Sequence, residues 1–255
     1  MGKHGLLVAT AVVAFLALAA ATTRVHAAAR AQLTVYAAAS LTDVFPRIDP
    51  VQRYSFGGSN TLAAQIQQGA PADVFASANM TLPNQLFAKG LCSKPVVFTR
   101  NTLIIVVPTS NPAGIRSVYD LGKAGVKLVV AGPGVPVGSY TLQILKNMGL
   151  SGAVQKNVVS QETDVREVLA KVALGEADAG FVYSTDARTV SGKVTVVKVP
   201  AWAQPKVRYG MCVVSASGNK TDARTFVNRV LSKAGQTKLL AAGFLPRVKP
   251  VPKKR

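Results

Sequence analysis

The sequence predicts an α/β fold of two similar lobes, each a mostly parallel sheet flanked by helices. Short apolar runs rich in β-branched residues are followed by small-residue turns and then by helical patterns, and this unit recurs along most of the chain. Pro108, Pro112 and Gly114 mark a division, after which a second α/β set begins. The length of 255 residues, 49% of them hydrophobic, suits one large domain or two small ones.

The first set begins with a short buried strand, 33–36, and a turn of small residues. Ser40-Leu-Thr-Asp43 then fits the Ser-x-x-acid start of a helix, which Pro46 and Pro50 cut short. The remaining expected elements are a strand at 52–56, a helix from the Gly57–Asn60 turn to about 68, a strand beginning near 73, a helix at 79–90 and one long apolar strand at 96–107.

The second set contains strands at 127–131, 154–159 and 177–183, with helices at 139–148 and 162–174 and a loop at 132–138. Two β-rich segments, 194–199 and 207–214, lead to amphipathic helices near 221–233 and 235–242. We expect the chain to cross between lobes near 107 and to return near 206. The predicted organisation is therefore lobe 1 at 28–107 plus 207–255 and lobe 2 at 108–206.

The amino terminus has the features of a secretory signal peptide at 1–27. Lys3 supplies positive charge, an apolar run extends over 5–22, and Val25-His-Ala27 offers a cleavage site. The alternative is an uncleaved anchor, because the apolar run is long for a signal peptide. No cysteine follows the run to carry a lipid. We therefore expect a soluble protein that begins near Ala28, in the periplasm, with simple secretion as the second possibility.

The chain is strongly basic, with 30 Lys and Arg against 11 Asp and Glu, a formal charge of +19. Loss of residues 1–27 removes Lys3 and Arg24 and leaves +17. Such a charge suits nucleic acid, an anionic membrane surface or the steering of an anionic ligand, or it decorates a solvated surface. Aromatic residues do not alternate with the basic ones, so we expect no nucleic-acid binding. Residues 247–255 form a basic, proline-containing tail.

Cys92 and Cys212 are the two cysteines, and each lies beside or within a predicted strand. In an oxidising compartment they form either a disulfide or two unpaired buried thiols. Both histidines, His4 and His26, fall in the predicted signal peptide. We therefore expect no metal site, and no Ser-His-acid set for hydrolysis can be assembled.

Hydrogen-bond donors collect at the ends of the predicted strands. Ser40 follows the first strand, Gly58-Ser-Asn60 follows the second, and Pro136-Val-Gly138 and Val182-Tyr-Ser184 follow strands of the second set. Ligands bind beyond the carboxyl ends of strands in open α/β sheets, and helix N-termini there favour anions. Gly57–Asn60 is not a Gly-x-Ser-x-Gly elbow, and 132–138 lacks the Gly-Lys-Ser/Thr ending of a P-loop. The pattern predicts a site for a small anion.

Several segments resemble the periplasmic molybdate-binding proteins of ABC transporters. They are LTVYAAASLTDV (33–44), SFGGSNTLA (55–63), QIQQGAPADVFA (65–76), VPVGSY (135–140), ETDVR (162–166), GFVYSTDA (180–187) and GF (243–244). The resemblance spans nearly all of 32–245 and implies a type II periplasmic-binding-protein fold, with the ligand held in the cleft between the lobes. Val137 replaces an alanine common in that family, and the first helix, at 44–52, is shorter here.

The resemblance also implies a ligand set made of hydroxyls and backbone amides. Ser40 and Ser59 would bind from lobe 1, and the N–H groups of Val137 and Val165 with the Tyr183 hydroxyl from lobe 2. We interpret Asp43 and Asp164 as helix-start charges that point away from this site.

The function that these residues imply is capture of molybdate, with tungstate as a second ligand, for a membrane permease. The protein would be a monomer without cofactor, bound metal or enzymatic activity. Two alternatives stay open. One is a binding protein for sulfate or another tetrahedral oxyanion, and the other is a secreted enzyme on the same fold.

Overall fold

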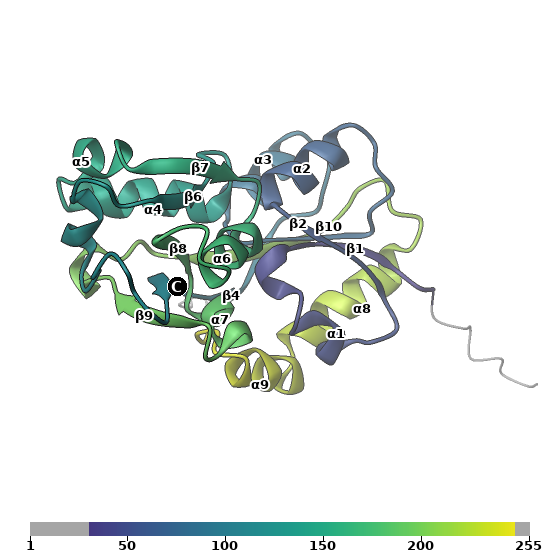
Figure 1. Cartoon of the computed structure of the whole chain (residues 1–255). Coiled ribbons are helices and arrows are strands. Elements are labelled where there is room, and N and C mark those ends of the chain that lie inside the picture. The colour runs from purple at the N-terminus through teal and green to yellow at the C-terminus, as the bar shows by residue number, and fades with distance from the viewer. Residues whose placement is uncertain (1–30, 248–255) are drawn as a thin grey trace, which may run out of the picture. The chain divides into compact units, whose positions relative to one another are not determined.

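Two five-stranded sheets organise residues 31–247, the part of the chain that the computed structural model describes (Figure 1). The predicted signal peptide at 1–27 and the basic tail after Arg247 lie outside these residues. Within the described part, no helix combines the length and the apolar character needed to span a membrane.

The first sheet has the strand order β2-β1-β3-β10-β4. β1, β2 and β3 run parallel, and β10 pairs antiparallel with both β3 and β4. Small and β-branched residues suit these strands because most of β1 and all of β3 is buried between layers. The bounds are β1 Thr34–Ala38, β2 Arg53–Gly57, β3 Val74–Ser77, β4 Val96–Arg100 and β10 Arg208–Val213.

The second sheet repeats this plan with the order β7-β6-β8-β5-β9. β6, β7 and β8 run parallel, and β5 pairs antiparallel with β8 and β9. The fourth strand of each sheet, β10 or β5, is thus the strand that follows a crossing between the lobes. The bounds are β5 Leu103–Pro108, β6 Leu128–Ala131, β7 Val158–Glu162, β8 Ala179–Tyr183 and β9 Val194–Lys198.

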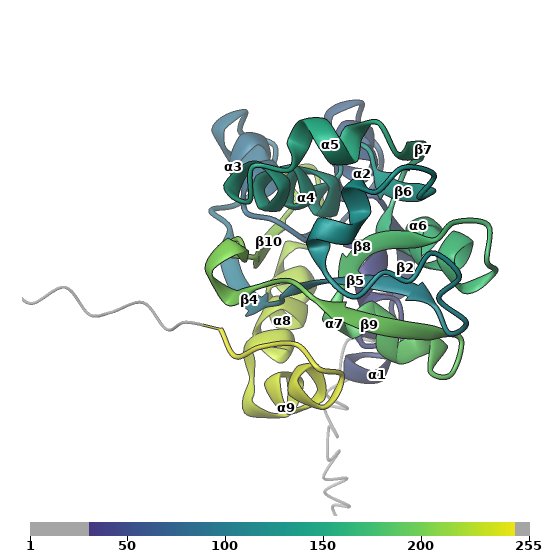
Figure 2. The ribbon, with the colours of Figure 1, turned by 60° about the vertical axis from the view of Figure 1, so that its left-hand side comes forward.

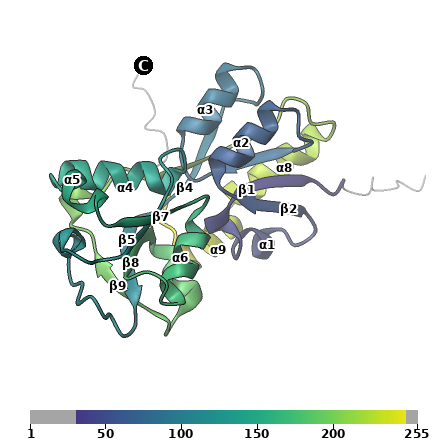
Figure 3. The same ribbon diagram turned by 45° about the horizontal axis from the view of Figure 1, so that its top comes forward.

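Helices cover both sheets (Figure 2), and the two sets are easiest to separate in Figure 3. α8 packs on β10 and α9 packs on α1, so the C-terminal helices join the first sheet, as expected. The helices of the first lobe are α1 Phe45–Ile48, α2 Ser59–Gln67, α3 Thr81–Ala88, α8 Lys220–Leu231 and α9 Lys233–Ala241. Those of the second are α4 Pro136–Asn147, α5 Ser151–Gln155, α6 Val165–Ala173 and α7 Ser184–Ala187.

The single strand expected at 96–107 is wrong. The chain breaks after Arg100, and β5 continues in the second sheet, so residues 103–107 pair with the other lobe from the one we expected. Asn101 explains the break, because its side-chain oxygen accepts the Thr102 amide at 2.9 Å and its side-chain nitrogen donates to Thr185 at 2.9 Å. These bonds replace ladder pairing at the crossing.

Two further expectations also differ. No regular helix starts at Ser40: residues Ala39–Leu41 form a single 3-10 turn, and α1 begins only at Phe45 with Pro46 at its start. The strand expected at 154–159 is the end of α5 followed by β7, because the Asn157 side chain donates to the carbonyls of Leu121 and Lys123 and holds that segment in a turn.

Cys92 and Cys212 form a disulfide, which settles the alternatives left open by the sequence. Cys212 lies on β10, and Cys92 lies in the segment between α3 and β4. Both sulfurs are buried in a small apolar cluster with Phe75 and Leu86. The bond joins residues 120 positions apart, and the complete second sheet lies between them.

Candidate functional site

A pocket lies where the carboxyl ends of the parallel strands of both sheets meet, and it contains about 210 Å³ of space, part of it open to solvent. The part of it that a water-sized molecule can enter is about 10 Å³, far below the 300–1,000 Å³ of pockets for drug-sized ligands, so this one suits a small solute. Residues from both lobes line it: Ala38, Ala39, Ser40, Gly57, Gly58, Ser59, Ala78, Val135, Pro136, Val137, Asp164, Val165 and Tyr183.

All five residues expected to bind ligand line this one pocket. Ser40 follows β1, Ser59 follows β2, Val137 follows β6, Val165 follows β7, and Tyr183 ends β8. None of them is more than 4% exposed. The structure therefore brings together residues that are up to 143 positions apart in the sequence, from Ser40 to Tyr183.

Three of these residues occupy the first turn of a helix. Ser59 is the first residue of α2, Val165 the first of α6, and Val137 the second of α4. Backbone N–H groups in the first turn have no acceptor within the helix, and the helix dipole places partial positive charge there. The Asp164 side chain accepts from the amides of Arg166 and Glu167. It thus caps α6, as we expected, although it also lines the pocket.

The hydroxyl groups are arranged to donate. Ser59 Oγ accepts the Ala78 amide at 3.1 Å, which leaves its own proton available. Ser40 Oγ lies 2.9 Å from Tyr209 Oη, and it too has a proton to donate whenever the tyrosine donates to it. Tyr183 Oη is buried and finds no hydrogen-bond partner within residues 31–247. An unpaired buried hydroxyl costs free energy, so a ligand that accepts from it offsets that cost.

Glycines allow two close approaches around the pocket. A Cβ added at Gly138 would lie 2.3 Å from the Ala131 carbonyl oxygen, so only glycine lets α4 begin this near the end of β6. A Cβ added at Gly58 would lie 2.3 Å from the carbonyl oxygen of Thr163. Gly58 precedes α2 in the first lobe, and Thr163 precedes α6 in the second. The two lobes therefore touch here, backbone against backbone.

Asp186 is a fully buried carboxylate beside the pocket. Its oxygens accept from the Tyr183 amide at 3.1 Å and from Arg166 Nε at 3.1 Å. Burial raises the pKa of Asp186 to about 7, although the Arg166 charge and the bond from Tyr183 act to lower it, and the charge of Asp164 raises it further. Burial also raises the pKa of Tyr183 well above its ordinary value, so the phenol keeps its proton and remains a donor.

Replacing Asp186 with asparagine will flatten the pH dependence of stability between about pH 4 and pH 7. In this window folded Asp186 holds a proton that the unfolded chain has released, so its contribution to stability is lost as pH rises towards the folded pKa of about 7. Urea unfolding of both proteins at pH 4.5 and pH 7.5 measures the difference. Equal pH slopes in the two proteins would contradict the assignment.

Sequence reasoning missed several residues that support the site. We expected Asp43 to be a helix-start charge, but no regular helix begins at Ser40. Asp43 instead pairs with Arg166 of the other lobe. Tyr209 holds Ser40 from β10, 169 positions away. No local pattern indicates such distant contacts. The glycine pair at 57–58, directly before a helix, was a signal in the sequence that another backbone segment, here Thr163, approaches closely.

Fold and pocket together define a class of protein: a two-lobed α/β solute-binding protein. Residues 33–245 match the sequence model of bacterial extracellular solute-binding proteins, and the chain belongs to this family. It is 39% identical over 222 residues to the molybdate-binding protein ModA of Mycobacterium tuberculosis, covering 83% of this chain and 84% of that protein. With ModA of Haemophilus influenzae the identity is 35% over 236 residues, covering 85% and 91%. The periplasmic molybdate-binding protein of Azotobacter vinelandii has the same fold, with a TM-score of 0.74 and 22% identity, over 85% of this chain and all of that one.

Proposed function

We propose that the protein captures molybdate outside the cytoplasm and delivers it to the permease of an ABC transporter. The observation that carries this proposal is the convergence of two serine hydroxyls, one unpaired phenol and three helix N-termini on one small pocket between the lobes. The sequence identity to molybdate-binding relatives supports the choice of ligand.

A dianion in this pocket is surrounded by neutral donors. A buried charge needs several oriented hydrogen bonds. Without them, the free-energy cost of removing the charge from water exceeds the net gain that hydrogen bonds usually provide. Asp164, the one charged residue among those lining the pocket, is engaged in capping α6. Both capping amides bind Asp164 Oδ1, so the proton of hydrogen phosphate would depend on the second oxygen of this one carboxylate, whereas every other lining residue is uncharged. These features favour a fully deprotonated tetrahedral oxyanion and permit its release.

The remaining parts of the proposal follow from this role. The chain acts as a monomeric carrier without enzymatic activity, cofactor or nucleic-acid partner, and tungstate binds in the place of molybdate. Residues 31–247 contain no group of three or more His, Cys, Asp or Glu side chains placed to hold a metal ion. A signal peptide at 1–27 directs the chain to the periplasm, and the family of extracellular solute-binding proteins supports export.

Alanine at Ser40 or at Ser59 will weaken molybdate binding by about 1–3 kcal/mol each, the range for a lost charge-assisted hydrogen bond. Calorimetric titration of the wild-type protein and both variants with molybdate measures the change. A matched control is Ser93→Ala, which also removes a serine that accepts a backbone amide, here that of Val213, but at a distance from the pocket. Unchanged affinity in both pocket variants would overturn the site assignment.

The same titration, repeated with tungstate, sulfate and phosphate, tests the ligand. Tight one-to-one binding of molybdate and tungstate, with sulfate far weaker, supports the proposal. Binding of sulfate without molybdate would assign the protein to the alternative class of sulfate-binding proteins with the same site residues. Binding of none of these anions would reject the proposed function.

A further inference from the structure

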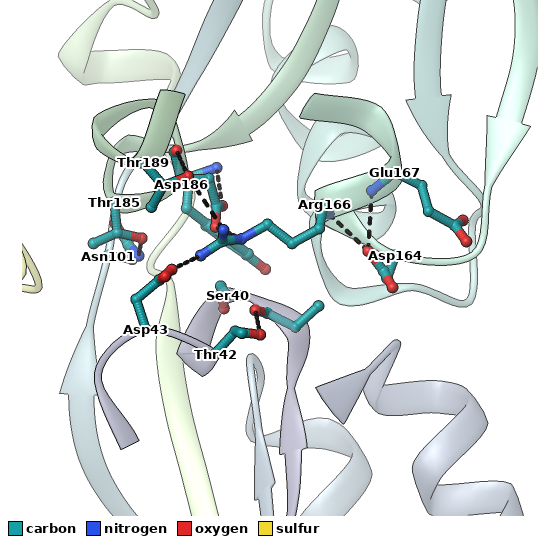
Figure 4. Close-up of polar contacts among 12 residues, drawn as sticks. Ser40, Thr42, Asp43, Asn101, Asp164, Arg166, Glu167, Thr185, Asp186 and Thr189 are labelled. Carbon is teal, nitrogen blue, oxygen red and sulfur yellow. Dashed lines mark hydrogen bonds and ion pairs between the residues drawn. The ribbon is translucent and has the colours of Figure 1, made fainter. Parts of the chain in front are cut away.

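Arg166 is the second residue of α6 and follows Val165, whose amide lines the pocket. Its guanidinium contacts three groups (Figure 4). Nη2 pairs with the Asp43 carboxylate, Nε lies 3.1 Å from Asp186 Oδ1, and Nη1 donates to Thr189 Oγ1 at 3.1 Å. Arg166 does not itself line the pocket that contains the five predicted ligand residues. Any effect of Arg166 on the anion is therefore exerted through other residues.

Two contacts of Arg166, and its own place in α6, lead to segments that hold a pocket residue. Asp43 lies in the turn that carries Ser40, three residues earlier. Asp186 accepts the Tyr183 amide with its second oxygen. Val165 is the covalent neighbour of Arg166. One guanidinium thus connects the backbone segments of three of the five pocket residues.

The three contacts of Arg166 differ in whether they depend on closure of the lobes. Asp186 and Thr189 belong to the same lobe as Arg166, so these contacts do not depend on lobe closure. Asp43 belongs to the first lobe, and its pairing with Arg166 requires that the lobes be closed. Asp186, which is fully buried, fixes the guanidinium in the direction of Asp43. Because the Arg166 guanidinium is already oriented, it loses less side-chain entropy when it pairs with the Asp43 carboxylate.

We propose that the Arg166–Asp43 pair is a latch between the lobes, so that Arg166 is a positioning residue that slows release of the bound oxyanion. This inference rests on the proposed function. It also explains how a pocket of neutral donors retains an anion: the positive charge stabilises the lobe contact and not the anion itself. Because the pair breaks only when the lobes separate, it affects dissociation more than association.

Asp43→Asn is the variant that tests the latch. Asp43 is 44% exposed and its carboxylate can be removed without unpairing Asp186, whereas truncating Arg166 would leave that buried carboxylate without its cation. We expect the molybdate dissociation rate to rise about 2- to 5-fold, the association rate to change less than twofold, and the melting temperature without molybdate to change little. Asp43→Glu, which keeps the carboxylate, should restore most of the slow dissociation.

Two controls separate a latch from a general effect of charge. Asp222→Asn removes one negative charge from α8, outside the pocket, and should leave the dissociation rate unchanged. Raising the salt concentration should speed dissociation from the wild-type protein and have little effect on Asp43→Asn, because salt screens this partly exposed pair. Equal dissociation rates for the wild-type protein and Asp43→Asn at low salt would overturn the proposal.

Small-angle X-ray scattering of the anion-free protein tests the latch independently of which ligand the protein binds. The latch predicts that Asp43→Asn has a larger radius of gyration than the wild-type protein, since fewer molecules close. If the wild-type protein binds none of the four oxyanions, the proposed function fails while a scattering difference still supports the latch. Identical scattering in that case would overturn the latch as well.

Discussion

Removing the Cys92–Cys212 disulfide will lower the free energy of unfolding by about 5 kcal/mol. The bond closes a loop of 120 residues, and restricting so long a loop in the unfolded chain is worth this amount in the chain-entropy description. The figure is a large fraction of the roughly 5–15 kcal/mol that stabilises a typical domain. The double variant Cys92→Ala with Cys212→Ala, unfolded in urea beside the wild-type protein, measures the loss.

Reductant distinguishes the covalent bond from the packing of the two sulfurs. Dithiothreitol should lower the stability of the wild-type protein towards that of the double variant and leave the double variant unaffected. Both sulfurs are buried among apolar side chains, so alanine also leaves a small cavity, and the reduced wild-type protein should remain slightly the more stable of the two. A reduced wild-type protein that unfolds at the same urea concentration as the oxidised protein would contradict the expectation.

Alanine at Gly58 will weaken molybdate binding by about 1,000-fold. The added Cβ would lie 2.3 Å from the Thr163 carbonyl oxygen of the opposite lobe, and a backbone atom cannot rotate away as a side chain does. The lobes then stop short of contact, and an anion held by the first lobe loses the donors of the second. Three lost charge-assisted hydrogen bonds at about 1.5 kcal/mol each amount to roughly three powers of ten in affinity. Calorimetric titration measures the change.

Gly152→Ala is the matched control. Gly152 lies in α5, outside the pocket, and a Cβ there would meet nothing within 4 Å. This variant should bind molybdate within a few fold of the wild-type protein. Gly58 has φ −59°, which alanine adopts readily, so the stability of the anion-free protein should not fall. If Gly58→Ala binds as tightly as Gly152→Ala, the lobes do not close through this contact.

The strand-turn-helix units were visible in the sequence because each element follows from local features. Buried strands are apolar runs in the sequence, and the turn Gly57-Gly-Ser-Asn60 indicates the start of α2 directly after β2. The two-lobed class, with all five pocket residues at strand ends, was predicted on this basis together with family resemblance. The break at Asn101 was not predicted, because both halves of 96–107 have strong β propensity and the break depends on bonds to Thr185.

Contacts between residues far apart in the sequence were beyond sequence reasoning for the same physical cause. The pairing of Asp43 with Arg166 spans 123 positions, and that of Ser40 with Tyr209 spans 169. Neither pair has a spacing that helix or strand periodicity produces. Ser40 was recognised as a site residue but assigned to a helix start, since its actual role depends on the tyrosine that reaches it from the last strand.

Within residues 31–247, two stretches of chain join the second sheet to the first, one at residues 101–102 and one between β9 and β10. A lobe attached through two segments rotates most easily about the axis that joins them, because rotation about any other axis strains one of the segments. Opening and closing then reduce to a single angle. A solute bound between the lobes would then fix that angle, and a permease of the proposed kind that contacts both lobes would distinguish the loaded protein from the empty one by the angle alone.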